Sequence, residues 1–270
     1  MSQSEKKLQV ALVTGAAGFI GFHVANLLLS EGWRVIGFDC LSDYYDVSLK
    51  TDREKMLLAN KNYRSVHENI EDPGALLKIF EEEAPEIVIH LAAQAGVRYS
   101  IDNPRSYLDS NVVGTFELLE AARNYPPSHL LIASTSSVYG ANQKTPLAET
   151  DKADTQMSFY AATKKCAESM AHSYSHLFDI PITMFRFFTV YGPWGRPDMA
   201  LFKFTKAILN GDKIDVYNRG DMQRDFTYIE DLVRAIRLLI DSPALPVKKL
   251  IRGSHQSKMQ SGVARFQVVN

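Results

Sequence analysis

The sequence predicts an α/β protein built on a doubly wound parallel sheet, and three observations support this fold class. From residue 8 to about residue 190, apolar runs of strand length alternate with amphipathic stretches of helix length. Three glycines, Gly15, Gly18 and Gly21, follow the first apolar run at intervals of three. The 270 residues, 46% hydrophobic and 23% charged, can form one large core and a smaller second domain. Together these features predict a Rossmann-type doubly wound sheet followed by a smaller second domain.

The elements of the first part follow from the hydrophobic pattern. Strands are expected at residues 8–13, 34–38, 63–70, 86–90, 130–134 and 182–188. Two long helices are expected at residues 104–123 and 158–178, and both carry apolar residues on more than one face. Such helices bury their second face within the chain or against a partner subunit. We expect a homodimer that forms through these two helices.

The alternation ends at residues 190–197, a segment too rich in glycine and proline to continue a strand or helix. We therefore expect two domains, residues 1–188 and residues 189–270. In the second, a helix is expected at residues 200–210, a strand at 214–217, an extended piece at 225–229 and a helix at 230–240. Residues 263–270 have the pattern of a strand on which the chain stops.

The glycine turn predicts a phosphate-binding loop between a strand and a helix. Gly15 permits the tight turn, Gly18 lets the backbone approach a pyrophosphate, and Gly21 lets the helix pack closely on the strand. The helix N-terminus then faces the anion. Such spacings also occur in ordinary loops, but here the second strand ends in Asp39. Its carboxylate can accept from the adenosine ribose and repel a 2′-phosphate, which favours NAD over NADP as the cofactor.

Tyr160 and Lys164 lie four residues apart in a predicted helix, so both side chains project from one face. A tyrosine phenol is a poor base at neutral pH, but a neighbouring ammonium favours the phenolate and lowers its pKa. Thr135, Ser136 and Ser137, at the end of the fifth strand, can place a hydroxyl opposite that phenol. The same spacing arises by chance on many helices, but its position after a glycine turn and an acidic strand end favours a catalytic pair.

Three further features have two interpretations each. The small residues at 90–96 leave room for a flat cofactor or serve close packing between strand and helix. His172 and His176 share a helix face, but no acidic third ligand accompanies them, so a solvated or interface face is favoured and no metal is expected. Arg224 can bridge to a diphosphate or form a surface ion pair.

Composition excludes several classes of protein. The formal net charge of −1 gives no general attraction to nucleic acid or to an anionic membrane. No apolar run reaches the length that spans a bilayer, and residues 1–7 lack the apolar segment of a signal peptide. We expect a cytoplasmic protein without nucleic-acid or membrane partners. Cys40 and Cys166 are not in a paired spacing and are interpreted as reduced thiols.

The motifs resemble those of the extended short-chain dehydrogenase/reductase family and, within it, the UDP-glucuronate 4-epimerases. The matching strings are residues 14–21, 43–46, 90–100, 135–140, 160–164, 186–198 and 224–231. The resemblance implies NAD-dependent epimerisation of UDP-glucuronate to UDP-galacturonate through a transient 4-keto intermediate. It also implies that Tyr160 is the base, that Lys164 holds the phenolate and the nicotinamide ribose, and that Thr135 helps to relay the proton.

The resemblance further implies the residues of two binding sites. Those expected to bind the cofactor, besides Tyr160 and Lys164, are Gly15, Gly18, Phe19, Ile20, Gly21, Asp39, Asn69, Ile70, Leu91, Ala92 and Ala93. Those expected to bind the UDP-sugar are Arg98, Ser136, Ser137, Thr189, Arg196, Ala200, Leu201, Val216, Tyr217 and Arg224. Among them, Thr189 and Arg196 match the positions that recognise the carboxylate, and Arg224 matches the contact to the UDP phosphate. Asn69 stands where the family usually has an aspartate. Family members also continue past Val269 with the rest of the second domain, which implies that the substrate-binding domain, residues 189–270, is C-terminally incomplete.

Four alternatives remain open at this point. UDP-glucuronate decarboxylase shares the 4-keto intermediate, and a UDP-galactose 4-epimerase would need no cation for a carboxylate and normally has Asn at the position of Thr189. Nucleotide-sugar 4,6-dehydratases carry Asp and Glu where Ser136 and Ser137 stand. A non-catalytic NAD-binding fragment or regulator is the alternative from another class, against which the intact Thr135, Tyr160 and Lys164 argue.

Overall fold

The computed structural model describes residues 8–221, 223–245 and 260–270, with only the backbone at Tyr217 and Asn218. Its centre is a seven-stranded parallel sheet in the order β3-β2-β1-β4-β5-β6-β9. The strands are β1 Val10–Thr14, β2 Arg34–Phe38, β3 Tyr63–Val66, β4 Ile87–His90, β5 His129–Ala133, β6 Ile182–Phe185 and β9 Phe266–Val269. The order reverses between β1 and β4, where doubly wound sheets bind ligands at the carboxyl ends of their strands. The predicted fold class is confirmed.

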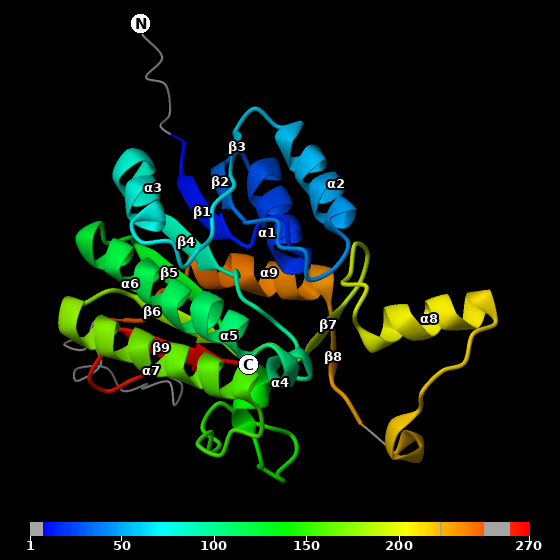
Figure 1. Ribbon diagram of the computed structural model, residues 1–270. Helices are drawn as coiled ribbons and strands as arrows, with labels where there is room; N and C mark the ends of the chain where they lie inside the picture. The colour runs from blue at the N-terminus through cyan, green and yellow to red at the C-terminus, as the bar shows by residue number, and fades with distance from the viewer. Residues whose placement is uncertain (1–7, 222, 246–259) are drawn as a thin grey trace, which may run out of the picture.

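Helices cover both faces of the sheet (Figure 1). The helices α1 (Phe19–Ser30) and α9 (Ile229–Ile240) pack on one face, and α3 (Ala75–Glu83), α6 (Gly114–Asn124) and α7 (Phe159–Phe178) pack on the other. Alternate residues of β1 belong to the two cores, with Val13 against α1 and Leu12 in the core of α6. The remaining helices are α2 (Val47–Leu58), α4 (Tyr99–Asp102), α5 (Pro104–Tyr107) and α8 (Ala200–Asn210).

The long helix expected at residues 104–123 consists of three successive segments. A π-helical stretch, Leu108–Val113, lies between α5 and α6. Within it, the side chain of Asn111 accepts from the Gln94 backbone N–H at 2.8 Å and donates to the Gln94 carbonyl oxygen at 3.0 Å. The same amide donates to the Thr163 hydroxyl at 3.1 Å. The wider helical turn therefore lets one buried side chain connect the loop after β4 to α7.

Some predicted strand boundaries were wrong. The third strand ends at Val66 rather than at residue 70, and the sixth ends at Phe185. The chain then forms β7 (Thr189–Tyr191), which pairs in parallel with β8 (Phe226–Tyr228) in a separate two-stranded sheet. Residues 214–216 form no strand, and a 3₁₀ turn occupies Tyr217–Gly220. Val216 is 63% exposed, and no strand in the described part of the chain lies beside this segment, so its backbone lacks ladder partners.

Segments far along the chain return to the central sheet. β9 pairs in parallel with β6, and α9 shares an apolar core with α1. In contrast, α8 has no buried residue and stands away from the sheet in Figure 1. The boundary after residue 188 stays a prediction, and β9 and α9, which follow it, pack on elements that precede it.

Candidate active site

A cavity of about 290 Å³ lies at the carboxyl ends of the central strands, at the reversal point of the strand order. Its walls come from the glycine turn, the segment after β2, the loop after β4, the end of β5, the start of α7 and the turn before α8. Segments distant in sequence therefore contribute to one site, as expected at the switch point of an open α/β sheet.

The glycine turn leaves the N-terminus of α1 open to this cavity. Gly15 has a φ of +71°, and a Cβ atom there would lie 2.8 Å from the backbone nitrogen of Ala92. A Cβ atom at Gly21 would overlap the carbonyl oxygen of Gly15. The helix has neither a side-chain cap nor an acidic residue in its first turn, so no side chain of α1 itself occupies its first N–H groups. This arrangement suits a phosphate group.

Asp39 and Lys50 lie together beyond the end of β2. The carboxylate of Asp39 accepts from the backbone N–H groups of Ala17 at 3.0 Å and Leu41 at 2.8 Å. Lys50, only 6% exposed, donates from Nζ to the carbonyl oxygen of Ser42 at 2.7 Å and to its hydroxyl at 2.8 Å. Burial lowers the pKa of Lys50, and the charge of Asp39 opposes this shift. An ammonium has three donors, so the third can serve a ligand.

Tyr160, Lys164 and Thr135 converge on the opposite wall. Ser158 caps α7 by accepting from the Ala161 backbone N–H at 3.1 Å, and Lys164 donates from Nζ to the carbonyl oxygen of Ala133 at 3.0 Å. Burial lowers the pKa of Lys164 to about 8. Burial raises the pKa of Tyr160, while a hydrogen bond from Thr135 and the charge of Arg196 lower it. The site therefore holds a phenol whose ionisation responds to nearby cations.

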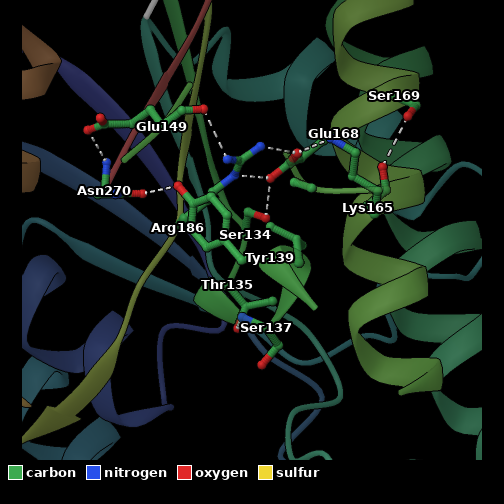
Figure 2. Close-up of polar contacts among 12 residues, drawn as sticks. Ser134, Thr135, Ser137, Tyr139, Glu149, Lys165, Glu168, Ser169, Arg186 and Asn270 are labelled. Atoms are coloured by element: carbon green, nitrogen blue, oxygen red, sulfur yellow. Dashed lines mark hydrogen bonds and ion pairs between the residues drawn. The ribbon is translucent and has the colours of Figure 1, made fainter. Parts of the chain in front are cut away.

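A buried ion pair lies behind this wall (Figure 2). The carboxylate of Glu168 accepts from Arg186 Nε and Nη2, both at 2.9 Å, and from the Ser134 hydroxyl at 2.7 Å. Lys165 donates to the same carboxylate at 2.9 Å, and the Arg186 guanidinium carbon lies 4.8 Å from the centre of the Tyr139 ring. Ser134 directly precedes Thr135, so the pair connects the end of β5 to the helix that carries the phenol.

Arg196 reaches the cavity from the turn before α8. Its guanidinium donates from Nε to Asp198 Oδ1 at 3.0 Å and from Nη2 to Asp198 Oδ2 at 2.6 Å. Tyr44, from the loop after β2, donates to Asp198 Oδ2 at 3.2 Å. Hydrogen bonds to Asp198 raise the pKa of Arg196 against the opposing effect of burial. A charged guanidinium is thus held in the same cavity as the Tyr160 phenol.

A second arginine joins the glycine turn to the turn that carries Arg196. Arg53 is fully buried, and it donates to the carbonyl oxygen of Ala17 at 3.0 Å and to the Tyr45 hydroxyl at 2.9 Å. Its other terminal nitrogen donates to the carbonyl oxygen of Trp194 at 2.6 Å. The two walls of the cavity are therefore connected through one side chain of α2.

The structure brings many, but not all, of the predicted site residues together. The predicted residues that line the cavity are Gly15, Gly18, Phe19, Ile20, Gly21, Asp39, Ile70, Leu91, Ala92, Ala93, Thr135, Tyr160, Lys164 and Arg196. Among the described residues, those outside the lining are Asn69, Arg98, Ser136, Ser137, Thr189, Ala200, Leu201, Val216 and Arg224, and the Tyr217 side chain lies outside the described part. The roles assigned to both groups stay predictions.

Local contacts explain two of the residues outside the lining. Asn69 is exposed and donates to Asp72 Oδ2 at 3.1 Å, because β3 ends before it. Arg224 is exposed and donates to the neighbouring carbonyl oxygen of Gln223 at 3.0 Å. Sequence reasoning missed Ser42, Tyr44 and Lys50, which line the cavity. A signal for Tyr44 was present, because residues 43–46 form one of the strings on which the family resemblance rests.

The histidines raised as metal ligands have other contacts. His172 Nε2 lies 3.0 Å from the Ser261 hydroxyl, and His176 Nδ1 lies 2.7 Å from the carbonyl oxygen of Val263. Within the described ranges, no group of three or more His, Cys, Asp or Glu side chains is arranged to hold a metal ion. Over the same ranges, no helix is long and apolar enough to span a bilayer.

Several known proteins and solved structures are similar to this chain. The family model "NAD dependent epimerase/dehydratase family" matches residues 11–250. A probable UDP-glucuronate 4-epimerase of Rhizobium meliloti (strain 1021) is 54% identical over 259 residues, which are 96% of this chain and 76% of that protein. Protein CapI of Staphylococcus aureus is 56% identical over 238 residues, 88% of this chain and 71% of that one. A crystal structure of UDP-glucuronic acid 4-epimerase from Bacillus cereus, in complex with UDP-glucuronic acid and NAD, superposes with a TM-score of 0.82 at 30% identity, covering 97% of this chain and 90% of that chain.

Proposed function

Because the chain belongs to the NAD dependent epimerase/dehydratase family, we propose that it is an isomerase that converts UDP-glucuronate into UDP-galacturonate by inverting carbon 4. One observation carries the proposal: Arg196 lies in the same cavity as Tyr160 and Lys164. A guanidinium binds a carboxylate with two parallel hydrogen bonds, which fix its orientation as well as its charge. The site thus combines a base for a sugar hydroxyl with a cation for a sugar acid.

The residues present suit NAD as the cofactor. The backbone at Gly15 and Gly21 is packed too closely for side chains, so the glycine turn can hold a pyrophosphate at the N-terminus of α1. Asp39 retains lone pairs for ribose hydroxyls beyond its two backbone partners, and its charge disfavours a 2′-phosphate. Bound NAD supplies reversible hydride transfer at carbon 4 of the sugar.

Tyr160 removes the proton of the 4-hydroxyl, since its phenol lines the cavity and forms a hydrogen bond with Thr135, while the other titratable group of α7 in the cavity, Lys164, is bound to the carbonyl oxygen of Ala133. Lys164 and Arg196 provide positive charge that favours the phenolate. Loss of a proton and a hydride leaves a 4-keto sugar, which turns about its link to the diphosphate. Tyr160 returns the proton after the opposite face of carbon 4 has been reduced, so the epimer forms without net oxidation.

Retention of carbon dioxide depends on the carboxylate's orientation. The 4-keto form of glucuronate is a β-keto acid, which loses carbon dioxide when the carboxylate bond aligns with the carbonyl π-system. Arg196 holds the carboxylate in one orientation through paired hydrogen bonds. This function separates the proposed epimerase from a UDP-glucuronate decarboxylase with the same intermediate.

The lining argues against elimination chemistry. The carboxylates that line the cavity in the described part of the chain are Asp39, Glu68 and Glu71, all from the segments after β2 and β3. Where the dehydratases have an Asp and a Glu, this chain has Ser136 and Ser137. Without an acid and a base beside Thr135, loss of water from a neighbouring carbon lacks its proton donor and acceptor.

The test is incubation of the purified protein with UDP-glucuronate and NAD⁺, followed by chromatographic separation of the nucleotide sugars. We expect UDP-galacturonate and at most traces of UDP-pentose. A UDP-pentose main product would identify a decarboxylase, and turnover of UDP-galactose in preference to UDP-glucuronate would contradict a role for Arg196 in selecting the acid. The variant Arg196→Ala should lose affinity for UDP-glucuronate on the order of 1.5–3 kcal/mol, the range for hydrogen bonds to charged groups, and should release more UDP-pentose.

The assembly and location expected from the sequence are also proposals. Apolar side chains on the outer surfaces of α6 and α7 remain partly exposed, among them Phe116 at 43% and Leu177 at 64%. Their exposure supports a homodimer through these helices, and light scattering of the purified protein tests it. The cytoplasmic location stays a prediction.

A further inference from the structure

Asp198 occupies only one edge of the Arg196 guanidinium. Its two oxygens accept from Nε and from Nη2 at 3.0 and 2.6 Å, the parallel geometry of an arginine–carboxylate pair. A guanidinium has five N–H donors, so this pair uses two of them. The other three, two on Nη1 and one on Nη2, have no hydrogen-bond acceptor among the described residues. Arg196 therefore retains a complete second edge for another carboxylate.

Of the Arg196–Asp198 pair, the arginine lines the cavity and the aspartate does not. The edge of Arg196 that Asp198 does not occupy is therefore the one left for a ligand there. The two members of the pair are similarly shielded, with side-chain exposures of 22% for Arg196 and 23% for Asp198. The charge of Arg196 also acts on the Tyr160 phenol, which places the guanidinium near the proposed reaction centre. Asp198 thus contacts Arg196 from outside the space where the substrate would lie.

Tyr44 fixes the position of Asp198. Its hydroxyl donates to Asp198 Oδ2 at 3.2 Å, and its ring centre lies 5.8 Å from the Arg196 guanidinium carbon. The Tyr44 ring packs at 4.9 Å from that of Tyr99. Gly96 makes room for it, because a Cβ atom there would lie 2.9 Å from the Tyr44 hydroxyl oxygen. The contact connects the loop after β2, from the cofactor side, to the turn of Arg196.

We propose that Asp198 is a positioning residue for substrate charge: it holds the Nε–Nη2 edge of Arg196 so that the Nη1–Nη2 edge binds the carboxylate of the sugar acid, and Tyr44 holds Asp198. The inference rests on the proposed function. An arginine without this partner has many rotamers of similar energy, so part of the binding free energy would be spent on ordering it. Asp198 would remove that cost before the substrate arrives.

The experiment compares two ligands that differ only at carbon 6. UDP-glucuronate carries a carboxylate there and UDP-glucose a neutral hydroxymethyl group, so the ratio of their dissociation constants isolates recognition of charge. Calorimetry on NAD-loaded protein in a Tyr160→Phe background measures binding without turnover. We expect the parent to prefer UDP-glucuronate and Asp198→Ala to reduce this preference by about tenfold, the scale of one charged hydrogen bond. The affinity for UDP-glucose should change by less than about twofold, since this ligand has no carboxylate to bind the Nη1–Nη2 edge of Arg196.

Two conservative variants and a control sharpen the result. Asp198→Asn keeps one acceptor oxygen and should restore part of the preference, and Tyr44→Phe should weaken it less than Asp198→Ala does. Asp212→Ala, which removes an exposed aspartate beyond α8, should leave both affinities unchanged. Equal losses for both ligands in Asp198→Ala would mean a general structural role. A stronger preference would mean that Asp198 competes with the substrate. Either result overturns the inference.

The same measurement distinguishes the inference from the proposal on which it rests. If the parent protein shows no preference for UDP-glucuronate over UDP-glucose, the proposed substrate is wrong, and the role of Asp198 falls with it. If the parent shows the preference and Asp198→Ala retains it in full, the proposed function stands and only the inference fails. A thermal unfolding midpoint for each variant close to that of the parent verifies that folding is intact.

Discussion

Substitution of Glu168 by glutamine should strongly destabilise this protein. The carboxylate is 4% exposed and Arg186 is 5% exposed, and the pair is linked by two hydrogen bonds of 2.9 Å. Glutamine keeps the size of the side chain and one acceptor oxygen but removes the charge. The guanidinium of Arg186 would then be buried without compensation, which costs about 3–5 kcal/mol when one partner of a buried pair is removed. For a chain of this size the melting temperature should fall by roughly 10 °C.

The assay is urea denaturation followed by circular dichroism, with a matched set of variants. Lys165 is an ion-pair partner of the same carboxylate, and its side chain is 33% exposed. The variant Lys165→Met should therefore lower the free energy of unfolding by less than about 1 kcal/mol. The double variant Arg186→Met with Glu168→Met removes both charges. It should therefore be destabilised by less than the sum of the losses measured for the single variants Arg186→Met and Glu168→Met. A Glu168→Gln protein within about 1 kcal/mol of the parent, or strict additivity in the double variant, would refute the reasoning.

Two other predictions concern the site and a third concerns two buried histidines. Tyr160→Phe should keep NAD binding and lose at least about 100-fold in turnover, measured by product chromatography, because only the proton acceptor is removed. Asp39→Asn should raise affinity for NADP relative to NAD by roughly tenfold, because a repelling charge near the 2′-phosphate disappears; fluorescence titration checks this. His90 and His129 are buried neutral, with pKa values lowered to about 3 and about 4. Unfolding lets them bind protons below pH 6.5, so each should remove about 2 kcal/mol of stability between pH 6.5 and 5, and acid denaturation of His→Gln variants tests it.

The features that could be predicted from the sequence are those that depend on residues close together along the chain. The glycine turn and the Tyr160–Lys164 spacing are local patterns, and their geometry follows from a strand-turn-helix unit and from one helical turn. The long helices were placed within a few residues, but the π-helical segment was not predicted, since it depends on contacts of Asn111 with another loop and with α7. The strand expected at residues 214–217 is absent. Alternation of apolar residues does not indicate whether a partner strand is available, so the pattern alone was misleading.

Pairings between distant segments were the part that could not be predicted. Nothing local indicates that β9, the last element, pairs with β6. Arg196 and Asp198 are two residues apart in the sequence, so an ion pair between them could be expected. The sequence does not indicate which nitrogens of Arg196 are used, and this geometry determines whether a second carboxylate can bind. Lys50 and Arg53 have the pattern of solvated helix residues, and yet both are buried in the structure, because the glycine turn and the loop after β2 supply their acceptors.

These long-range contacts predict coupling between the proposed cofactor site and the proposed sugar site. Arg53 connects the carbonyl oxygen of Ala17, in the glycine turn, to that of Trp194, two residues before Arg196, and Tyr44 reaches Asp198 from the segment that begins at Asp39. Ordering the glycine turn around NAD should therefore also order the turn that carries Arg196. A coupling free energy acts equally in both directions, so a bound sugar acid should increase affinity for NAD, and UDP-glucose, which leaves the second edge of Arg196 unused, should do so less. Equal enhancement by both ligands in NAD titrations would show that the diphosphate alone carries the coupling.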